Sequence, residues 1–144
     1  MADRPILQTA ADVRAALAGR KTQLYRIQDK DGRGPWRPSF SDAWVDYGKD
    51  DRLCPPVQIE FPKWEKAIWR ARVFGLAHFG CCVEGIRGIH QWFTPDEIRK
   101  LRGFGFRLVD ASSLVPICTG KHQIIGGSVM PLAYLPEVDW EIAE

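Results

Sequence analysis

The sequence has little excess charge of either sign, no long hydrophobic run and no repeated or low-complexity segment. Its 144 residues include 20 Lys and Arg and 18 Asp and Glu, which gives a net charge of +2. The basic residues are scattered among acids, whereas a nucleic-acid-binding protein usually shows a basic stripe. No apolar run approaches the ~20 residues of a membrane span, and no secretory signal pattern opens the chain. We therefore expect a cytoplasmic protein without a nucleic-acid or membrane partner.

Cysteines are few, and their spacing suits a metal site poorly. The sequence holds four of them: Cys54, Cys81, Cys82 and Cys118. Adjacent cysteines disfavour a disulfide ladder, and in a reducing compartment cysteines commonly act as small buried hydrophobes. Zinc sites prefer two pairs of closely spaced ligands. Here His78 with Cys81 has that spacing, and Cys118 with His122 would complete the set. We favour packed thiols over zinc or a cysteine nucleophile, and the sequence leaves open whether these four side chains converge.

Local patterns predict a single α+β domain over residues 1–144, with a small mixed or antiparallel sheet and three to four helices. Thr94-Pro95-Asp96-Glu97 is a strong helix start, with an N-cap Thr, Pro at the first helical position and Glu at the third. That helix ends at Gly103, and apolar spacing predicts others over 9–19, 62–73 and about 86–93. Alternation predicts strands over 23–27, 76–82, 104–108, 122–125 and, as an edge strand, 129–135.

A long irregular region, residues 28–56, interrupts this pattern. Four aromatic residues are interleaved with its glycines and prolines: Trp36, Phe40, Trp44 and Tyr47. Loops of this length are often binding loops, and the aromatics predict that it packs down. Its turn at 29–35 lacks the ligand set of a calcium loop and the Gly-Lys-Ser/Thr ending of a phosphate loop. The turn's glycines nevertheless allow a close backbone approach, and Arg33 and Arg37 can meet an anion.

Arg26 is the unusual residue of the first predicted strand, because it is charged within a short apolar run. If the strand is central, the guanidinium must be paired or must face a cleft, since an unpaired buried charge is costly. One interpretation is an ion pair with an acid such as Glu60 or Glu84. The other is an anchor for the phosphate or carboxylate of a ligand.

Several short motifs occur in an order that resembles a family of small uncharacterised phage and prophage proteins, over about residues 24–126. They are Leu24-Tyr25-Arg26-Ile27, Asp31-Gly32-Arg33-Gly34-Pro35-Trp36, His78-Phe79-Gly80-Cys81, Trp92-Phe93 and Gly120-Lys121-His122-Gln123. The layout also resembles the ADP-ribosyltransferase core. That fold begins with a strand carrying an Arg or His that binds NAD. A middle strand leads into a helix, often through Ser or Tyr, and a later strand starts with a catalytic Glu.

The resemblance to the ADP-ribosyltransferase core implies roles for individual residues. Arg26 stands at the first position and would anchor a nucleotide or another anionic ligand, with NAD as the implied cofactor. Gln123 stands at the position of the catalytic Glu and would contact a ribose hydroxyl, while Trp36 or Tyr25 would stack on a ring. The turn after Gly80 offers cysteines rather than Ser or Tyr. Because Gln cannot act as an anionic base, the resemblance implies nucleotide binding without turnover, or a different reaction, and leaves open whether the chain is an enzyme.

A rival interpretation is a non-enzymatic interaction module, such as an inhibitor of a host protein. Trp and Tyr are enriched at the energetic centres of protein interfaces, and the long loop could present them. This interpretation expects Trp36 and Trp44 to be exposed and Arg26 to lie outside any concave polar site.

Overall fold

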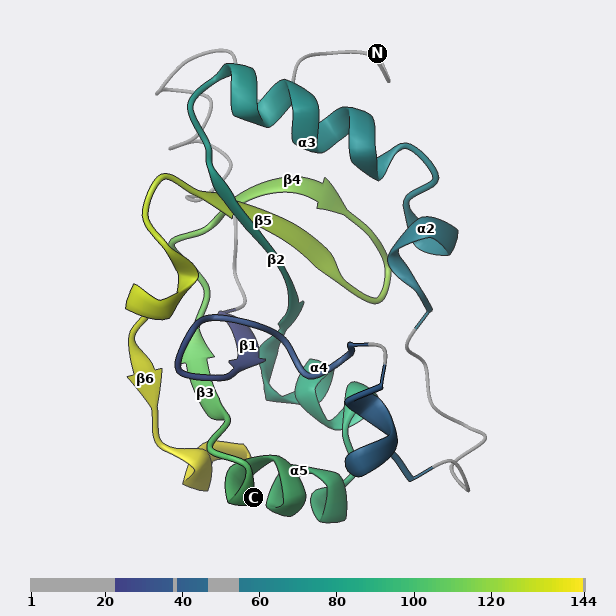
Figure 1. Cartoon of the computed structure of the whole chain (residues 1–144), viewed down its shortest axis with the longest axis vertical. Coiled ribbons are helices and arrows are strands. Elements are labelled where there is room, and N and C mark those ends of the chain that lie inside the picture. Colours follow the sequence, from purple (N-terminus) through teal and green to yellow (C-terminus); the bar gives the residue numbers. More distant parts are fainter. Residues whose placement is uncertain (1–22, 38, 47–54, 144) are drawn as a thin grey trace.

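The computed structural model describes residues 23–37, 39–46 and 55–143. Its centre is a six-stranded antiparallel sheet with the strand order β4-β5-β2-β1-β3-β6 (Figure 1). The strands are β1 (Leu24–Gln28), β2 (His78–Glu84), β3 (Arg107–Asp110), β4 (Val115–Thr119), β5 (Ile124–Ser128) and β6 (Glu137–Val138). Together with the helices between them, this sheet confirms the predicted α+β class and its antiparallel alternative.

The sheet consists of two halves joined by a short seam. Only two registered pairs connect β1 to β2, at Leu24↔Glu84 and Tyr25↔Val83. By contrast, β2 pairs with β5 over five positions and β1 pairs with β3 over four. In Figure 1 the half with β4, β5 and most of β2 lies above the half with β1, β3 and β6. Beyond Tyr25 the two central strands are no longer paired with each other.

Four α-helices occur in the described part of the chain: α2 (Val57–Glu60), α3 (Trp64–Val73), α4 (Gly85–Trp92) and α5 (Pro95–Gly103). In Figure 1, α3 lies beside β4 and β5, while α4 and α5 lie at the opposite end. Apolar residues of α3, such as Ala71, share a cluster with Ile117 and Ile125 of β4 and β5. Among the residues described, no helix is long and apolar enough to cross a membrane.

The helices around α4 and α5 follow from local sequence signals. The Thr94 side chain accepts a hydrogen bond from the Glu97 backbone N–H, and the Glu97 side chain accepts one from the Thr94 N–H. This capping box confirms the predicted start of α5. In α4, a Cβ atom on Gly88 would lie 2.8 Å from Cβ of Val83 in β2. Glycine is therefore used here because it lets α4 pack closely against the strand that precedes it.

Several predicted elements need correction. The strand predicted over 129–135 is wrong: this segment holds a 3-10 helix, η2 (Leu132–Tyr134), and the last strand is β6. The strand predicted to start at 104 begins at Arg107, because Gly105 turns the chain with a φ of 89°. The helix predicted from 62 begins at Trp64, and β4 was not predicted. The predicted helix over 9–19 lies outside the described residues.

Candidate functional site

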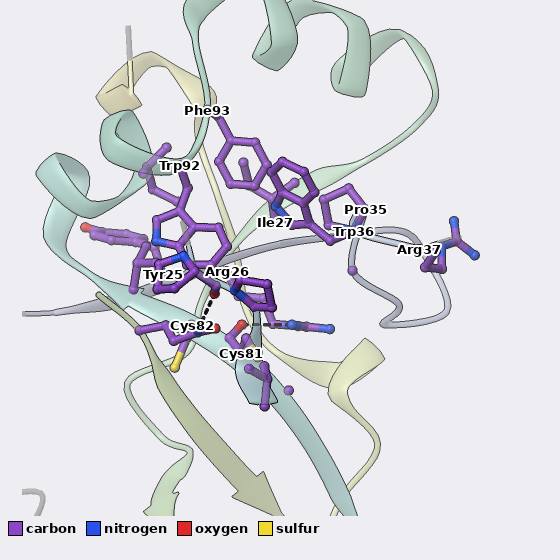
Figure 2. A pocket seen from close by; sticks show the side chains of 18 of the residues that line it. Tyr25, Arg26, Ile27, Pro35, Trp36, Arg37, Cys81, Cys82, Trp92 and Phe93 are labelled. Atoms are coloured by element: carbon purple, nitrogen blue, oxygen red, sulfur yellow. Dashed lines mark hydrogen bonds between the residues drawn. The ribbon is translucent and has the colours of Figure 1, made fainter. Parts of the chain in front are cut away.

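A cavity of about 580 Å³ lies where β1 and β2 separate (Figure 2). Its walls come from β1, β2, α4, the loop after β1, the start of α2 and the residue before β5. The lining residues are Tyr25, Arg26, Ile27, Gly34, Pro35, Trp36, Arg37, Pro55, Pro56, Val57, Gln58, Gly80, Cys81, Cys82, Val83, Ile89, Trp92, Phe93 and Gln123. This set contains two arginines and, within the described residues, no Asp, Glu or His.

Arg26 spans the gap between the two halves of the sheet. Its Nη1 donates a hydrogen bond to the Cys81 carbonyl at 2.8 Å, and its Nη2 donates to the Gly32 carbonyl at 3.0 Å. Its Nε donates to Oε1 of Gln28 at 3.0 Å. Gly80 makes room for the guanidinium, since a Cβ there would lie 2.8 Å from Cζ of Arg26. The Arg26 side chain is therefore fixed by three acceptors in three different elements.

The charge of Arg26 is balanced only indirectly. All three of its acceptors are neutral, and neither Glu60 nor Glu84, the expected ion-pair partners, forms an ion pair with it in the described structure. Burial lowers the pKa of the Arg26 guanidinium, and the nearby Cys81, Cys82 and Asp29 act in the opposite direction. The guanidinium remains charged because the usual pKa of Arg is far above neutrality. It therefore contributes a positive charge to the cavity, and no carboxylate of the described residues is hydrogen-bonded to it.

Gln123 lies just before β5 and is 3 % exposed. Its Nε2 donates a hydrogen bond to the Pro55 carbonyl at 2.9 Å, which leaves Oε1 to accept a further bond. The neighbouring His122 N–H donates to Oε2 of Glu60 at 2.8 Å. These two bonds hold residues 55–60 against the start of β5. Gln123 therefore lines the cavity and also stabilises the position of one of its walls.

Aromatic side chains form the apolar wall of the cavity (Figure 2). Trp36 is 40 % exposed, and its ring lies 4.6 Å from that of Trp44 and 6.2 Å from those of Trp92 and Phe93, between centroids. Trp44 is fully buried, and its Nε1 donates to the Pro35 carbonyl. The predicted packing of the aromatic loop is therefore confirmed for its described part, and Trp36 offers a partly open ring face.

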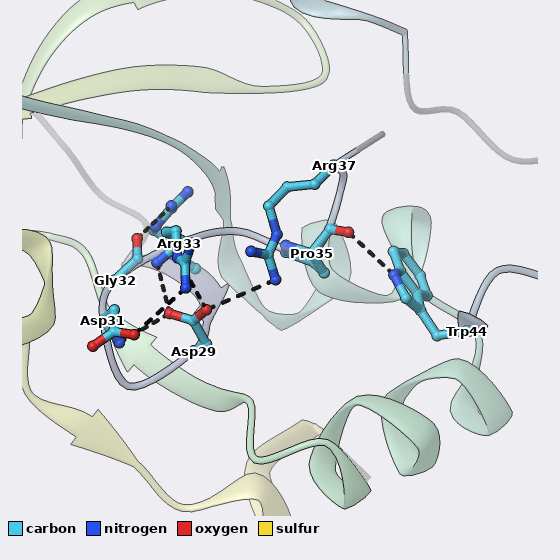
Figure 3. A network of polar contacts seen from close by, with 8 residues as sticks. Asp29, Asp31, Gly32, Arg33, Pro35, Arg37 and Trp44 are labelled. Atoms are coloured by element: carbon cyan, nitrogen blue, oxygen red, sulfur yellow. Dashed lines mark hydrogen bonds and ion pairs between the residues drawn. The ribbon is translucent and has the colours of Figure 1, made fainter. Parts of the chain in front are cut away.

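The turn after β1 is organised by Asp29 (Figure 3). Its Oδ1 accepts hydrogen bonds from the backbone N–H groups of Asp31 and Arg33, both at 2.9 Å. Its Oδ2 lies 3.5 Å from Nε of Arg33 and 3.8 Å from Nη2 of Arg37. Gly32 has a φ of 86° and donates its N–H to the Asp29 carbonyl. The turn is thus stabilised by contacts among its own residues.

The cysteines give little sign of reactivity. Cys81, Cys82 and Cys118 are not joined to one another by disulfides. Burial raises the pKa of both Cys81 and Cys118, and Glu60 raises that of Cys81 further while Arg26 acts against it. Cys81 lies within β2 rather than before a helix, so no helix N-terminus lowers its pKa. No three His, Cys, Asp or Glu side chains of the described segments converge as a metal site, so His78, Cys81, Cys118 and His122 do not form one.

Five of the six site residues proposed from the sequence line the same cavity: Tyr25, Arg26, Trp36, Arg37 and Gln123. The sixth, Arg33, has a side chain that is 63 % exposed, and it pairs with Asp29 and Asp31 outside the cavity. Sequence reasoning did not propose the wall residues Trp92, Phe93 and Pro55. Helical spacing had marked the apolar face around Phe93, but nothing in the sequence showed that this face meets the loop after β1.

Comparisons with known proteins found no matching family model, no matching curated protein and no matching solved structure.

Proposed function

We propose that the chain binds a nucleotide or another anionic ligand in this cavity, which acts as an ADP-ribosyltransferase-like site. Arg26 anchors the anion, Oε1 of Gln123 accepts a hydrogen bond from a ribose hydroxyl, and Trp36 or Tyr25 packs on a ring. A cavity of about 580 Å³ lies within the usual range for small-molecule sites. Its mixture of apolar walls and a few convergent polar groups is also typical of such sites.

One observation carries this proposal: Arg26 and Gln123, which are far apart in the sequence, line one cavity. Arg26 lies in the first described strand, and Gln123 directly precedes β5. Between them, β2 runs straight into α4 at Glu84 and Gly85. The resemblance expects an NAD-binding Arg at the first of these positions and a catalytic Glu at the position of Gln123. Its middle position, expected in a turn directly after Gly80, is corrected by the structure: Cys81, Cys82 and Val83 lie within β2, and the step from strand to helix comes later. The proposed phage or prophage relationship rests separately on the order of the short motifs over about residues 24–126.

The chemistry of the lining supports binding without turnover. Most enzymes that break a glycosidic bond use a carboxylate as a base or to stabilise developing positive charge, and the described lining holds none. A carboxylate at position 123 would also lack the N–H that Gln123 donates to the Pro55 carbonyl. The local structure therefore suits an amide at this position. We expect no release of nicotinamide from NAD.

The alternative, a protein-interaction module built on the aromatic loop, receives less support. It expects Trp44 to be exposed, but Trp44 is fully buried. It also expects no concave site around Arg26, yet Arg26 lines the cavity. The remaining argument for it is the partial exposure of Trp36, which a ligand-binding wall explains equally well.

Thermal unfolding with NAD, ADP-ribose and AMP tests the proposal. A ligand at about 100 times its dissociation constant adds ~2.7 kcal/mol, which raises the Tm of a domain of this size by about 5–10 °C. Trp36→Leu should reduce this shift because Trp36 forms the open part of the wall. Trp69→Leu is the matched control, because Trp69 is 66 % exposed on α3 and does not line the cavity.

A wild-type protein whose Tm responds to none of these compounds would contradict the proposal. The double variant Trp36→Leu/Arg26→Gln gives a second test, once circular dichroism shows that it is folded. A ligand-induced Tm shift equal to that of wild type would also contradict the proposal. Detection of nicotinamide in the NAD sample would retain the site and overturn the claim that it lacks turnover.

A further inference from the structure

We propose that Arg37 is a second anion-contacting residue of the cavity, so that the ligand carries two anionic groups, as a diphosphate does. This inference rests on the proposed function, since it concerns the same cavity. Of the three arginines near Asp29, Arg26 is fixed, Arg37 is available to the ligand and Arg33 lies outside the cavity.

Arg37 is held loosely. It lines the cavity, and its side chain is 32 % exposed. Its closest acidic contact is 3.8 Å, from Nη2 to Oδ2 of Asp29, which is too long for a hydrogen bond. Its Nε is buried and has no hydrogen-bond partner in the described structure. The guanidinium also lies 4.8 Å from the centroid of the Phe40 ring. A buried N–H donor without a partner is rare in folded proteins and requires an explanation.

Arg26 provides the contrast. All three of its nitrogens donate hydrogen bonds of 2.8–3.0 Å. Moving its guanidinium toward a ligand would break bonds that join three elements. Moving the guanidinium of Arg37 would lose a weak ion pair and its contact with the Phe40 ring, and would give Nε a partner. We infer that Arg26 supplies a fixed charge and that Arg37 adjusts its position to complete the contact.

The charges around the turn favour a ligand with more than one negative charge. Arg33 pairs with both Asp29 and Asp31, and Arg37 lies 3.8 Å from Asp29 (Figure 3). Burial lowers the pKa of the nearby Arg26 guanidinium, and Asp29 acts against this larger effect. Neither acid lines the cavity, whereas Arg26 and Arg37 both do. A monoanion would balance one of the two lining charges. A diphosphate, for example in a nucleoside diphosphate or a dinucleotide, would meet both.

Isothermal titration calorimetry of Arg37→Gln and Arg33→Gln tests this assignment with inorganic pyrophosphate, ADP, AMP and adenosine as probes. The two variants are matched, because each removes one arginine that pairs with Oδ2 of Asp29, and only Arg37 lines the cavity. We expect Arg37→Gln to weaken ADP binding by about 10- to 100-fold, the value of one charge-assisted hydrogen bond. The loss should be smaller for AMP and absent for adenosine, and Arg33→Gln should stay within about twofold of wild type.

Other outcomes separate this inference from the proposed function. If wild type binds ADP and neither variant weakens it, or both weaken it equally, the role of Arg37 is refuted while the site remains. Equal losses for ADP and AMP would refute the two-group ligand. If wild type binds pyrophosphate through Arg37 but no nucleotide, the assignment survives and the nucleotide proposal fails. If wild type binds none of the probes, both proposals fall.

Discussion

Replacing Gly80 by Ala gives a direct test of how the site is built. In the sheet Gly80 is paired with Gly126 of β5. A Cβ at position 80 would lie 2.8 Å from Cζ of Arg26 and 2.8 Å from Cδ1 of Leu132. The Leu132 methyl can rotate away at little cost, but the Arg26 guanidinium is held by three hydrogen bonds. A single methyl group therefore forces the Arg26 guanidinium to move.

The expected cost follows from the bonds that the movement breaks. Hydrogen bonds to a charged group contribute about 1.5–3 kcal/mol each, and overpacking a core costs about 1–3 kcal/mol. Loss of the bond to the Cys81 carbonyl together with partial strain gives about 2–4 kcal/mol. In urea this lowers the unfolding midpoint by about 1–2 M for a domain of this size. Ligand binding should weaken in the same variant, because the guanidinium has left its position.

Two controls make the result specific. Gly103, the last residue of α5, would meet no atom within 4 Å on substitution by Ala, so Gly103→Ala should keep or slightly raise stability. In a double-mutant cycle, Arg26→Leu should remove at least half of the cost of Gly80→Ala, since the clash partner is gone. A Gly80→Ala variant that unfolds at the wild-type urea concentration would refute the reasoning.

Three further predictions concern other parts of the chain. Thr94→Ala should cost about 1 kcal/mol through loss of the α5 cap, seen as a Tm lower by about 2–4 °C and restored by Thr94→Ser. Burial raises the pKa of Cys81 and Cys118, so both thiols should be alkylated more slowly than free cysteine at pH 8, and faster as the pH rises. Peptide mass spectrometry follows the reaction, and rates equal to that of free cysteine would contradict this. Gln123→Glu should lower the free energy of unfolding by about 1–3 kcal/mol at pH 8 but by less at pH 4, where the protonated acid can still donate to the Pro55 carbonyl. Urea unfolding measures this, and a difference between the wild-type and variant midpoints that does not change with pH would contradict it.

Elements with signals inside a few residues were predictable from the sequence. The capping box at Thr94 fixes the start of α5 by two hydrogen bonds between positions three apart. The strand at Leu24 was equally clear from alternation. β4 was missed because Pro116 and a register shift between Pro116 and Cys118 interrupt its pattern. The segment 129–135 was misassigned because its apolar residues pack as a 3-10 helix rather than alternate across a sheet.

The candidate site was predictable only in part. The sequence showed that Arg26 is unusual, since a charged residue within a short apolar strand needs a partner. Its real acceptors were not, because two of them are backbone carbonyls, Cys81 and Gly32, and every residue has one. For the same reason nothing in the sequence paired Gln123 with Pro55. The interpretation of an ion pair with Glu60 or Glu84 is wrong for the described structure, because two backbone carbonyls and the amide oxygen of Gln28 accept the hydrogen bonds of the guanidinium instead.

The position of the cavity follows from the way the sheet divides. A backbone carbonyl that leaves a ladder must find another donor. After Tyr25 in β1, and before Val83 in the antiparallel β2, the two strands are not paired, and the Arg26 side chain donates to the Cys81 carbonyl across the opening. A long side chain with donors in several directions is needed to reach this carbonyl, Gly32 and Gln28 together, and Arg is the residue with that geometry. The arginine that joins the two separated strands therefore also places its guanidinium at the cavity wall, where an anion can meet it.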